Sequence, residues 1–554
     1  MQNPPRKGDN YFFKEKKMNL SLNGNSLSIA DLYSTATNRK STIALSSIAK
    51  KAMQRSRALV EDWLASDEII YGVTTGFGEF ANVRIPHDKI EQLQTNLIIS
   101  HAAGAGDPLP PEIVRAMMIL RINALAKGFS GIRPETVEFI VKFFNAGLIP
   151  VIPSQGSVGS SGDLVQLAHM VLSFMGKGKA IDNGSRKKHG TLKNAQLTIE
   201  DSKKVLKRHN LQPLTLTAKE GLALINGTQM MTSFASLIIH EAFQLMKLAD
   251  ISCALSIEAL KGTDTAFDER IHKLRPYKGQ LASAANLRNL MNHSEIRESH
   301  RHNDDRVQDA YSLRCAPQVH GASRDALEYV ASKVEIEINS ANDNPLIFPD
   351  EKPARSEAKR QHRAGGQHLE GGNFHGQPMA LAMDFAAIAL SELANISERR
   401  VERMVNGALS RLPRFLTTNG GLNSGLMIAQ YTAASLVSEN KVLSHPASVD
   451  SIPTSANQED HNSMGSIAAQ KCWRVLKNAQ TVIAIELMTA AQAIDFHSPL
   501  KCGKGTNAAY QTIRKSIPHL EEDRILHDDI QKALGLVKDG SVLKNVEKKI
   551  GVLE

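Results

Sequence analysis

The sequence predicts a mainly α-helical fold, with a long central helical bundle that follows a loop-rich N-terminal domain. From about residue 216, long segments rich in Ala, Leu, Ile and Met recur at helical spacing. Strand patterns are sparse, and no repeat period is present. Because 42% of the 554 residues are hydrophobic, the chain can bury a sizeable core.

Three regions follow from this pattern: a basic flexible tail (1–17), an N-terminal domain (18–215) and a central and C-terminal helical bundle (216–554). In the N-terminal domain we expect two short strands that pair with each other, and two helices; their ranges are 20–22 and 27–29, then 110–126 and 133–145. In the bundle we expect helices over 218–260, 377–409, 424–443 and 463–496. These bundle helices are apolar around much of their circumference, so they should pack together and also bury surface between subunits.

Composition excludes several classes of partner. The formal net charge is +9, but no dense basic helix is present, so nucleic acid is not an expected partner. The positive excess lies in the tail and in two polar stretches, at 185–193 and 353–366, that are typical of surface loops. The longest charge-free stretches carry Asn, Thr and Gln, so they are too polar to span a membrane.

Cysteine usage and the N-terminal composition predict a cytoplasmic protein. The four cysteines are far apart and form no CxxC pair: Cys253, Cys315, Cys472 and Cys502. This spacing favours neither a disulfide framework nor a zinc module, and fits a reducing compartment. The N-terminus is basic but lacks the apolar run of a secretory signal.

The most unusual local feature is SQGSVGSSGDL, at Ser154 to Leu164. By composition alone this is most often a surface turn with a helix cap, and it lacks the lysine and spacing of a phosphate loop. However, Ser160, Ser161 and Gly162 place a dehydratable serine before a residue without a side chain. The Gly162 nitrogen could attack the Ser160 carbonyl carbon, and loss of two waters would turn Ser161 into an electrophilic methylidene group. No ordinary side chain supplies such an electrophile.

With this triplet, six further motifs in order make the chain resemble the aromatic amino acid ammonia-lyase and aminomutase family. They are YGVTTGFG at Tyr71, NLIISHAAG at Asn96, EGLALINGTQ at Glu220, QDAYSLRCAPQVHGA at Gln308, GGNFHGQP at Gly371 and LSHPASVDSIPTSANQEDH at Leu443. The resemblance implies an ammonia-lyase/fumarase-like fold and a 4-methylidene-imidazol-5-one (MIO) formed from Ser160, Ser161 and Gly162, with no external cofactor. It also implies a homotetramer of 222 symmetry in which three subunits build each active site.

The resemblance also implies roles for individual residues. Tyr71 matches the base that removes the substrate's β proton, and Arg314 matches the arginine that binds the substrate carboxylate. The remaining matches position the substrate or the MIO loop: Asn226 and Gln308 orient the substrate and the prosthetic group, Tyr311 sets the loop, and Phe374 packs near the substrate. Taken singly, each of these side chains is more often a packed or hydrogen-bonded structural residue.

Two places point to histidine as the substrate. Ser100-His101 is the pattern of members that act on histidine, whose histidine contacts the substrate imidazole. The second place is Glu459 in SANQEDH, where members acting on phenylalanine resemble NQD followed by an apolar residue. A carboxylate can accept the imidazole N–H, whereas beside a phenyl ring it would be buried without a partner. We therefore expect Glu459 to act in catalysis, His101 to bind substrate, and the reaction to convert L-histidine to urocanate and ammonia.

Several alternatives and departures remain. The cluster HSEIRESHRHNDD, from His293, lacks HExxH spacing, so a hydrated loop is expected there and no metal. Ser160 replaces the family's usual alanine, Thr74 replaces an asparagine, and Val165-Gln166 replaces Ala-Pro. The alternative functions are a phenylalanine or tyrosine ammonia-lyase, a 2,3-aminomutase, and a catalytically silent structural homologue.

Overall fold

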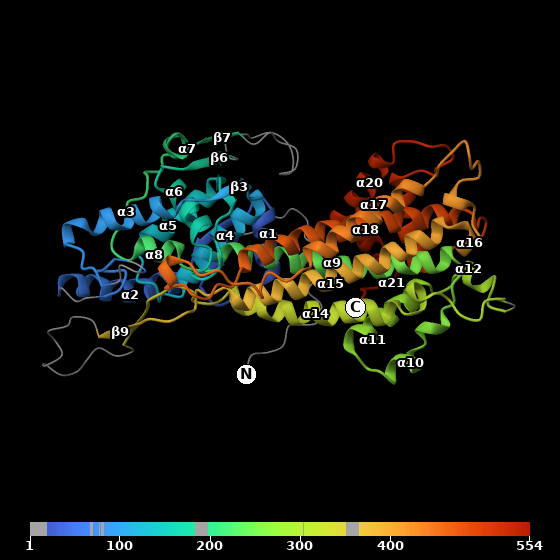
Figure 1. Ribbon diagram of the computed structural model, residues 1–554, viewed down its shortest axis with the longest axis horizontal. Coiled ribbons are helices and arrows are strands. Elements are labelled where there is room, and N and C mark those ends of the chain that lie inside the picture. The colour runs from blue at the N-terminus through green and yellow to red at the C-terminus, as the bar shows by residue number, and fades with distance from the viewer. Residues whose placement is uncertain are drawn as a thin grey trace. The chain divides into compact units, whose positions relative to one another are not determined.

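The structure is a computed structural model that describes residues 19–66, 70–76, 78, 82–182, 198–302, 304–350 and 365–554 (Figure 1). The predicted basic tail, the stretch at 185–193 and most of the 353–366 insertion lie outside the described residues. Helices predominate and the strands are short, so the predicted mainly α fold is confirmed.

The first of two compact units is formed by Met1–Leu237, Ser332–Met383 and Pro446–Gln470. Its helices are α1 (Ile29–Thr37), α2 (Ser47–Ala65), α3 (Ile90–His101), α4 (Pro111–Ala126), α5 (Pro134–Asn145), α6 (Leu164–Phe174), α7 (Ser202–Arg208) and α8 (Glu220–Ile225), with 3-10 turns at His87–Lys89 and Ser455–Asn457. Helices α4 and α5 match the two helices predicted for the N-terminal region.

The strands of this unit form small separate sheets. They are β1 (Asn19–Leu22), β2 (Thr42–Leu45), β3 (Ala105–Pro108), β4 (Leu148–Pro150), β5 (Pro153–Gln155), β6 (Lys179–Asp182), β7 (Ile199–Asp201), β8 (Leu346–Pro349) and β9 (Gly366–Leu369). β1 and β2 are parallel, and Asn19 pairs with Thr42. The other sheets are antiparallel, in the orders β3-β5, β4-β6-β7 and β8-β9.

The predicted strand over 27–29 is wrong, although 20–22 lies within β1. Ser28 is instead the N-cap of α1, and its hydroxyl accepts a hydrogen bond from the Asp31 amide over 3.0 Å. The capping bond satisfies an amide that the helix itself leaves without a partner, so it favours helix at Ile29 over an extended strand.

The second unit is formed by Ile238–Ala331, Asp384–His445 and Lys471–Glu554. Its helices are α10 (Glu269–Lys273), α11 (Lys278–Leu290), α12 (Glu295–Glu298), α13 (Tyr311–Arg314), α16 (Gly407–Ser410), α17 (Met427–Leu443), α19 (Lys504–Ser516), α20 (Leu526–Lys538) and α21 (Ser541–Ile550), with 3-10 turns at Thr265–Phe267 and Arg414–Leu416. Four long helices contribute residues to both units: α9 (Gln229–Ala259), α14 (Ala316–Glu337), α15 (Gln377–Val405) and α18 (Gly465–Asp495). The domain boundaries at residues 17 and 215 stay a prediction.

A buried carboxylate joins three of the long helices within the second unit. Glu486 of α18 accepts hydrogen bonds from Ser252 and Ser256 of α9 and from Ser397 of α15. It also forms an ion pair with the buried Arg400 of α15. Helices α9, α15 and α18 therefore lie side by side in this unit, as Figure 1 shows. A charge in this position is tolerated because hydrogen bonds and a counter-charge surround it.

By length and composition, α15 alone among the helices of the described residues is long and apolar enough to cross a membrane. However, 67% of its most apolar window is buried inside the protein. The buried core helix of a globular protein passes the same test, so this is weak evidence for a span.

Candidate active site

The serine- and glycine-rich loop between β5 and α6 is held by segments that are distant in sequence. The Met464 amide donates to the Val158 carbonyl oxygen over 2.8 Å, and the Gly376 amide donates to that of Gly159 over 2.9 Å. Ser463 Oγ adds a second hydrogen bond to the Gly159 carbonyl at 2.9 Å. These three hydrogen bonds therefore fix the backbone conformation of the loop.

Gly162 lies where only glycine fits. Its φ is +77°, and a Cβ at this position would lie 2.1 Å from the carbonyl oxygen of Gly227. That carbonyl also accepts a hydrogen bond from the Asp163 amide over 2.8 Å. Asn226, one residue earlier, donates from Nδ2 to the Ser161 carbonyl oxygen over 3.2 Å. The triplet is thus pressed against the break between α8 and α9, which divides the single helix predicted over 218–260.

Asp163 anchors the loop to the first turn of α9, a role that the sequence did not indicate. Its Oδ2 accepts hydrogen bonds from the Met230 and Met231 amides, at 2.8 and 3.1 Å, and its Oδ1 accepts one from Ser466 Oγ at 2.8 Å. Burial raises the pKa of Asp163 to about 6, although these hydrogen bonds lower it. The position of Asp163 at the start of α6 gave no signal for this role, because its side chain does not cap α6 and instead accepts from amides at the N-terminus of α9.

Glu459 contacts both serines of the triplet. Its Oε2 accepts a hydrogen bond from Ser160 Oγ at 2.8 Å, and its Oε1 accepts one from Ser161 Oγ at 2.6 Å. Thr454 Oγ1 donates to Oε2 as well, at 2.8 Å. The Thr454 and Glu459 backbones form an antiparallel bridge that closes a turn with left-handed backbone over 455–457. This turn presents the Glu459 carboxylate to the triplet.

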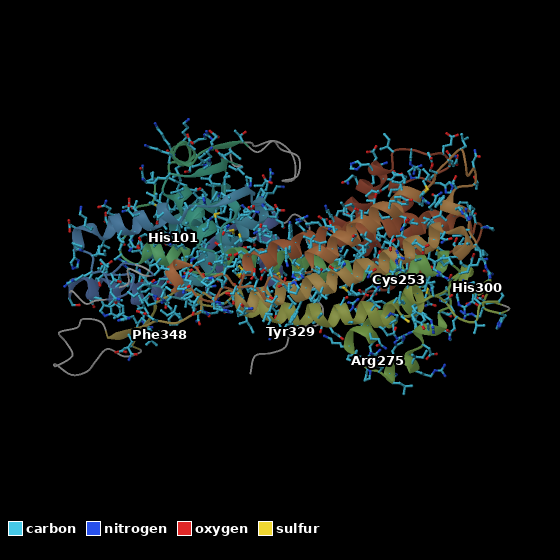
Figure 2. All side chains as sticks on the ribbon, in the orientation of Figure 1. His101, Cys253, Arg275, His300, Tyr329 and Phe348 are labelled. Carbon is cyan, nitrogen blue, oxygen red and sulfur yellow. The ribbon has the colours of Figure 1, made fainter. Side chains whose placement is uncertain are left out.

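His101 is the last residue of α3 and is labelled in Figure 2. Its Nδ1 lies 3.1 Å from Ser100 Oγ, which also donates to the Leu97 carbonyl oxygen over 3.1 Å. Burial lowers the pKa of His101, although a hydrogen bond with the Leu97 carbonyl and the charge of Glu459 act in the opposite direction. The imidazole is therefore mainly neutral near pH 7.

Tyr71 lies in the turn that begins directly after Ile70. Its Oη accepts a hydrogen bond from the Gly78 amide over 3.2 Å. Burial raises the pKa of Tyr71 above its ordinary value, and the charges of Glu370 and Glu459 raise it further, against the effect of the Gly78 amide. As a result, the side chain is a neutral phenol in this subunit at neutral pH.

These side chains line one pocket of about 790 Å³ in the first unit. Seven of the residues singled out from the sequence lie on its wall: Tyr71, His101, Ser160, Ser161, Asn226, Phe374 and Glu459. Apolar contacts come from Leu97, Leu222 and Ile225, whereas Glu370 and Asp460 add carboxylates. The pocket is large enough for a free amino acid and carries both polar and apolar walls.

Two further pocket residues, His375 and His461, were not predicted. Their rings stack with centroids 5.9 Å apart and planes 4° apart. His375 Nδ1 accepts a hydrogen bond from the Gln377 amide over 3.3 Å, and His375 Nε2 lies 3.1 Å from the His461 carbonyl oxygen. With Nδ1 accepting, the ring proton lies on Nε2 and is donated to that carbonyl. Both residues belong to motifs used above, but no spacing rule indicated that they stack.

Four predicted site residues do not line this pocket: Gly162, which lies in the first unit, and three residues of the second unit. Tyr311 and Arg314 are on α13, and Gln308 lies just before it. The Arg314 guanidinium carbon is 4.5 Å from the centroid of the exposed Tyr311 ring. Arg314 Nε is buried without a hydrogen-bond partner among the described residues. Arg400 Nη1 supports the segment by donating to the Ser312 carbonyl oxygen over 3.3 Å.

The departures from the family pattern are accommodated by local hydrogen bonds. Thr74 is buried, and its Oγ1 accepts from the Ile70 amide over 2.9 Å. Gln166 is also buried, and its Nε2 donates to the Pro153 carbonyl oxygen over 3.4 Å. Thr74 Oγ1 and Gln166 Nε2 thus each have a partner close to the loop, whereas Gln166 Oε1 is buried without one among the described residues.

In the part of the chain that the structure describes, no group of three or more His, Cys, Asp or Glu side chains is arranged to hold a metal ion. Side chains of the histidine-rich stretch from His293 instead form ion pairs. Arg297 and Arg301 both pair with Asp264, and His300 contacts Asp304.

Comparison with known proteins assigns the family. The model of the family described as aromatic amino acid lyase matches residues 27–515. The chain belongs to the aromatic amino acid lyase family. This confirms the family expected from the six motifs, and solved members of the family share the mainly α fold.

Relatives of the chain within the aromatic amino acid lyases are similar over nearly their whole length. The histidine ammonia-lyase of Gloeobacter violaceus is 52% identical, over 97% of this chain and 99% of that protein. That of Caldanaerobacter subterraneus is 50% identical, over 96% and 99%. Among solved structures, histidine ammonia-lyase from Trypanosoma cruzi has 43% identity and a TM-score of 0.85, with 96% of both chains covered. Tyrosine aminomutase from Streptomyces globisporus has 36% identity and a TM-score of 0.86, with 97% of this chain and 100% of that chain covered.

Proposed function

We propose that the protein is a histidine ammonia-lyase, a carbon–nitrogen lyase that converts L-histidine to urocanate and ammonia. The observation that carries the proposal is the Glu459 carboxylate beside the serine triplet, in a pocket that also contains His101. A carboxylate and a neutral imidazole suit the polar ring of histidine, whereas a phenyl ring would offer neither group a hydrogen-bond partner. The high identity to histidine ammonia-lyases supports the same substrate.

The triplet fits the MIO prosthetic group that the family forms from its own chain. Position 162 admits no Cβ, and Asn226 holds the Ser161 carbonyl. In the proposed maturation the Gly162 nitrogen bonds to the Ser160 carbonyl carbon, and that carbonyl oxygen leaves as water with the two amide protons of Ser161 and Gly162. Ser161 Oγ leaves as a second water with the Ser161 Cα hydrogen. Once formed, the group supplies an electrophilic carbon that activates the substrate's amine as a leaving group.

The chain's own residues would supply the remaining chemistry. Tyr71 Oη removes a β proton, so it must be a phenolate when substrate is bound. Because burial and two nearby carboxylates raise its pKa, activation requires positive charge that this pocket does not itself provide. The substrate ammonium and the guanidinium of Arg314 are suitable sources. Glu459 and His101 hold the imidazole ring, and Phe374 packs against it.

The residues Gln308, Tyr311 and Arg314 would reach the pocket from other subunits of a homotetramer with shared active sites. Exposed apolar side chains on the helices of the second unit support this association, because such side chains are typical of subunit interfaces. They include Tyr329 of α14, labelled in Figure 2, Phe385 and Ile388 of α15, and Tyr431 of α17. A cytoplasmic location is proposed on the four free cysteines, which suit a reducing compartment.

A product assay tests the proposed substrate. Purified protein is incubated with L-histidine, L-phenylalanine or L-tyrosine, and the products are separated by chromatography. Urocanate and ammonia in equal amounts, formed from histidine alone, are the expected result. Cinnamate or coumarate would favour an aryl ammonia-lyase, and a β-amino acid would favour a 2,3-aminomutase. No turnover of any of the three would favour a silent homologue.

Mass spectrometry tests the prosthetic group independently of activity. The peptide that contains Ser160 to Gly162 is expected to lack two waters relative to its sequence mass. The other peptides of the digest serve as internal controls, because their masses should equal those calculated. An unmodified triplet peptide in protein that turns over histidine would contradict the proposed electrophile.

Replacing Glu370 by glutamine is expected to move the pH dependence of activity to lower pH. Glu370 raises the pKa of Tyr71 through its charge, so removing that charge lowers this pKa and the phenolate forms at lower pH. The ascending limb of kcat/KM for histidine against pH measures the effect. Asp460→Asn is the matched control, since Asp460 lines the pocket but is not one of the two carboxylates whose charge raises the pKa of Tyr71. An unmoved limb, or a limb moved to higher pH, would show that the base is not Tyr71.

A further inference from the structure

The two carboxylate oxygens of Glu459 have different partners. Oε2 accepts hydrogen bonds from Ser160 Oγ and Thr454 Oγ1, both at 2.8 Å. Among the described residues, the hydrogen bond to Oε1 comes from Ser161 Oγ, at 2.6 Å. One oxygen is thus bound by two permanent hydroxyl groups, and the other by the hydroxyl that the proposed maturation removes.

Maturation therefore removes the hydrogen-bond donor of one Glu459 oxygen and keeps both donors of the other. The Ser161 hydroxyl leaves as water, so Oε1 loses its partner. The Ser160 side chain lies outside the new five-membered ring, because only the carbonyl carbon of this residue enters it. Its hydroxyl remains available to Oε2, as does that of Thr454.

We propose that Ser160 is a positioning residue for substrate recognition: together with Thr454 it holds Oε2, so that Oε1 is directed to the imidazole N–H of the substrate. This inference rests on the proposed function and adds to it. An alanine at position 160 would leave Oε2 with Thr454 as its donor, and the carboxylate could then rotate about its terminal bond. A fixed acceptor binds a ligand N–H more tightly than a mobile one, because its orientation is set before binding.

Both donors are themselves well fixed. Ser160 is buried, and the preceding Gly159 carbonyl accepts hydrogen bonds from Gly376 and Ser463. Thr454 pairs with Glu459 through two backbone hydrogen bonds, of 3.0 and 3.3 Å. The two hydroxyls therefore approach Oε2 from separate and rigid parts of the site, which restricts the carboxylate more than either donor alone.

Binding measurements on a chain without the electrophile test this role. Ser161→Ala removes the same hydroxyl that maturation removes, and it prevents turnover, so L-histidine affinity can be measured by calorimetry. Adding Ser160→Ala to this variant is expected to weaken L-histidine binding by about 10-fold, since a hydrogen bond to a charged group is lost. Adding Thr454→Ala should have a similar effect, whereas Thr454→Ser keeps the hydroxyl and should retain affinity within about 3-fold.

A second readout separates positioning from maturation. In the chain that retains Ser161, Ser160→Ala is expected to lose two waters from the triplet peptide as completely as the parent does. Its KM for histidine should rise about 10-fold while kcat changes less than about 3-fold, because ground-state binding is what the hydroxyl supports. Thermal unfolding of each variant checks that the fold is intact.

The possible failures are distinguishable. Equal histidine affinity with and without the Ser160 hydroxyl would overturn the positioning role and leave the proposed function standing. An incompletely dehydrated triplet in Ser160→Ala would also overturn it, by assigning Ser160 to maturation. If the Ser161→Ala parent binds no histidine and the unmodified sequence does not turn it over, both the inference and the proposed function fail.

Discussion

Ser161→Ala is expected to lower kcat for L-histidine by on the order of 10³-fold or more. The substitution removes the oxygen that must leave as water, so the triplet cannot become an electrophile. No ordinary side chain on the pocket wall is electrophilic, so none can replace the triplet. Steady-state kinetics with urocanate detection measures the loss. The mass of the triplet peptide, which should show no missing water from Ser161, links the loss to its cause.

Ser154→Ala is the matched control, because it changes a serine of the same segment that lies outside the pocket wall. Its activity should remain within about 3-fold of the parent, as expected for a side chain without a role in binding or catalysis. If Ser161→Ala retained more than a tenth of the parental kcat, ammonia elimination would not depend on this triplet.

Tyr71→Phe is expected to lower kcat by about 10² to 10⁴-fold, the range typical of removing a general base. Phenylalanine keeps the ring and its packing but lacks the Oη that receives the Gly78 amide hydrogen bond. Dehydration of the triplet and affinity for L-histidine should change little. Single-turnover kinetics of product release and formation would place the defect in the chemical step.

Tyr277→Phe serves as the control for loss of a tyrosine hydroxyl, since Tyr277 is exposed and lies in the second unit. It should have parental activity. A Tyr71→Phe variant with more than about a tenth of the parental kcat would require a different base.

Much of the fold could be predicted because helical periodicity is a local property. The segments over 377–409, 424–443 and 463–496 contain α15, α17 and α18, and their apolar residues recur at the spacing that a helix requires. The break between α8 and α9 was missed, because Gly227 stays non-helical through contact with Gly162, which is 65 residues away. No local window contains such a contact.

In the candidate site, too, local motifs could be predicted but contacts between distant residues could not. The sequence indicated Ser160 and Glu459 separately through their motifs, and the structure places them 2.8 Å apart although they are 299 residues apart in the chain. The part of Asp163 in holding the loop could not be predicted, since it depends on two amides of α9 and on Ser466. The roles assigned to Gln308, Tyr311 and Arg314 stay predictions, because the pocket wall comes from the first unit.

The anchoring carboxyl of Asp163 also sets a thermodynamic limit on the loop. In the unfolded chain this group ionises near 3.8, whereas in the folded chain its pKa is about 6. Below the lower value the acid is neutral in both states and the shift costs no stability, whereas between the two values the unfolded chain ionises while the folded chain stays protonated, so stability falls as the pH rises from about 3.8 to about 6. From the size of this shift, about 3 kcal/mol of conformational stability is given up at neutral pH. Asp163 thus anchors the loop of the serine triplet at a cost in conformational stability at neutral pH, and this cost comes from its burial.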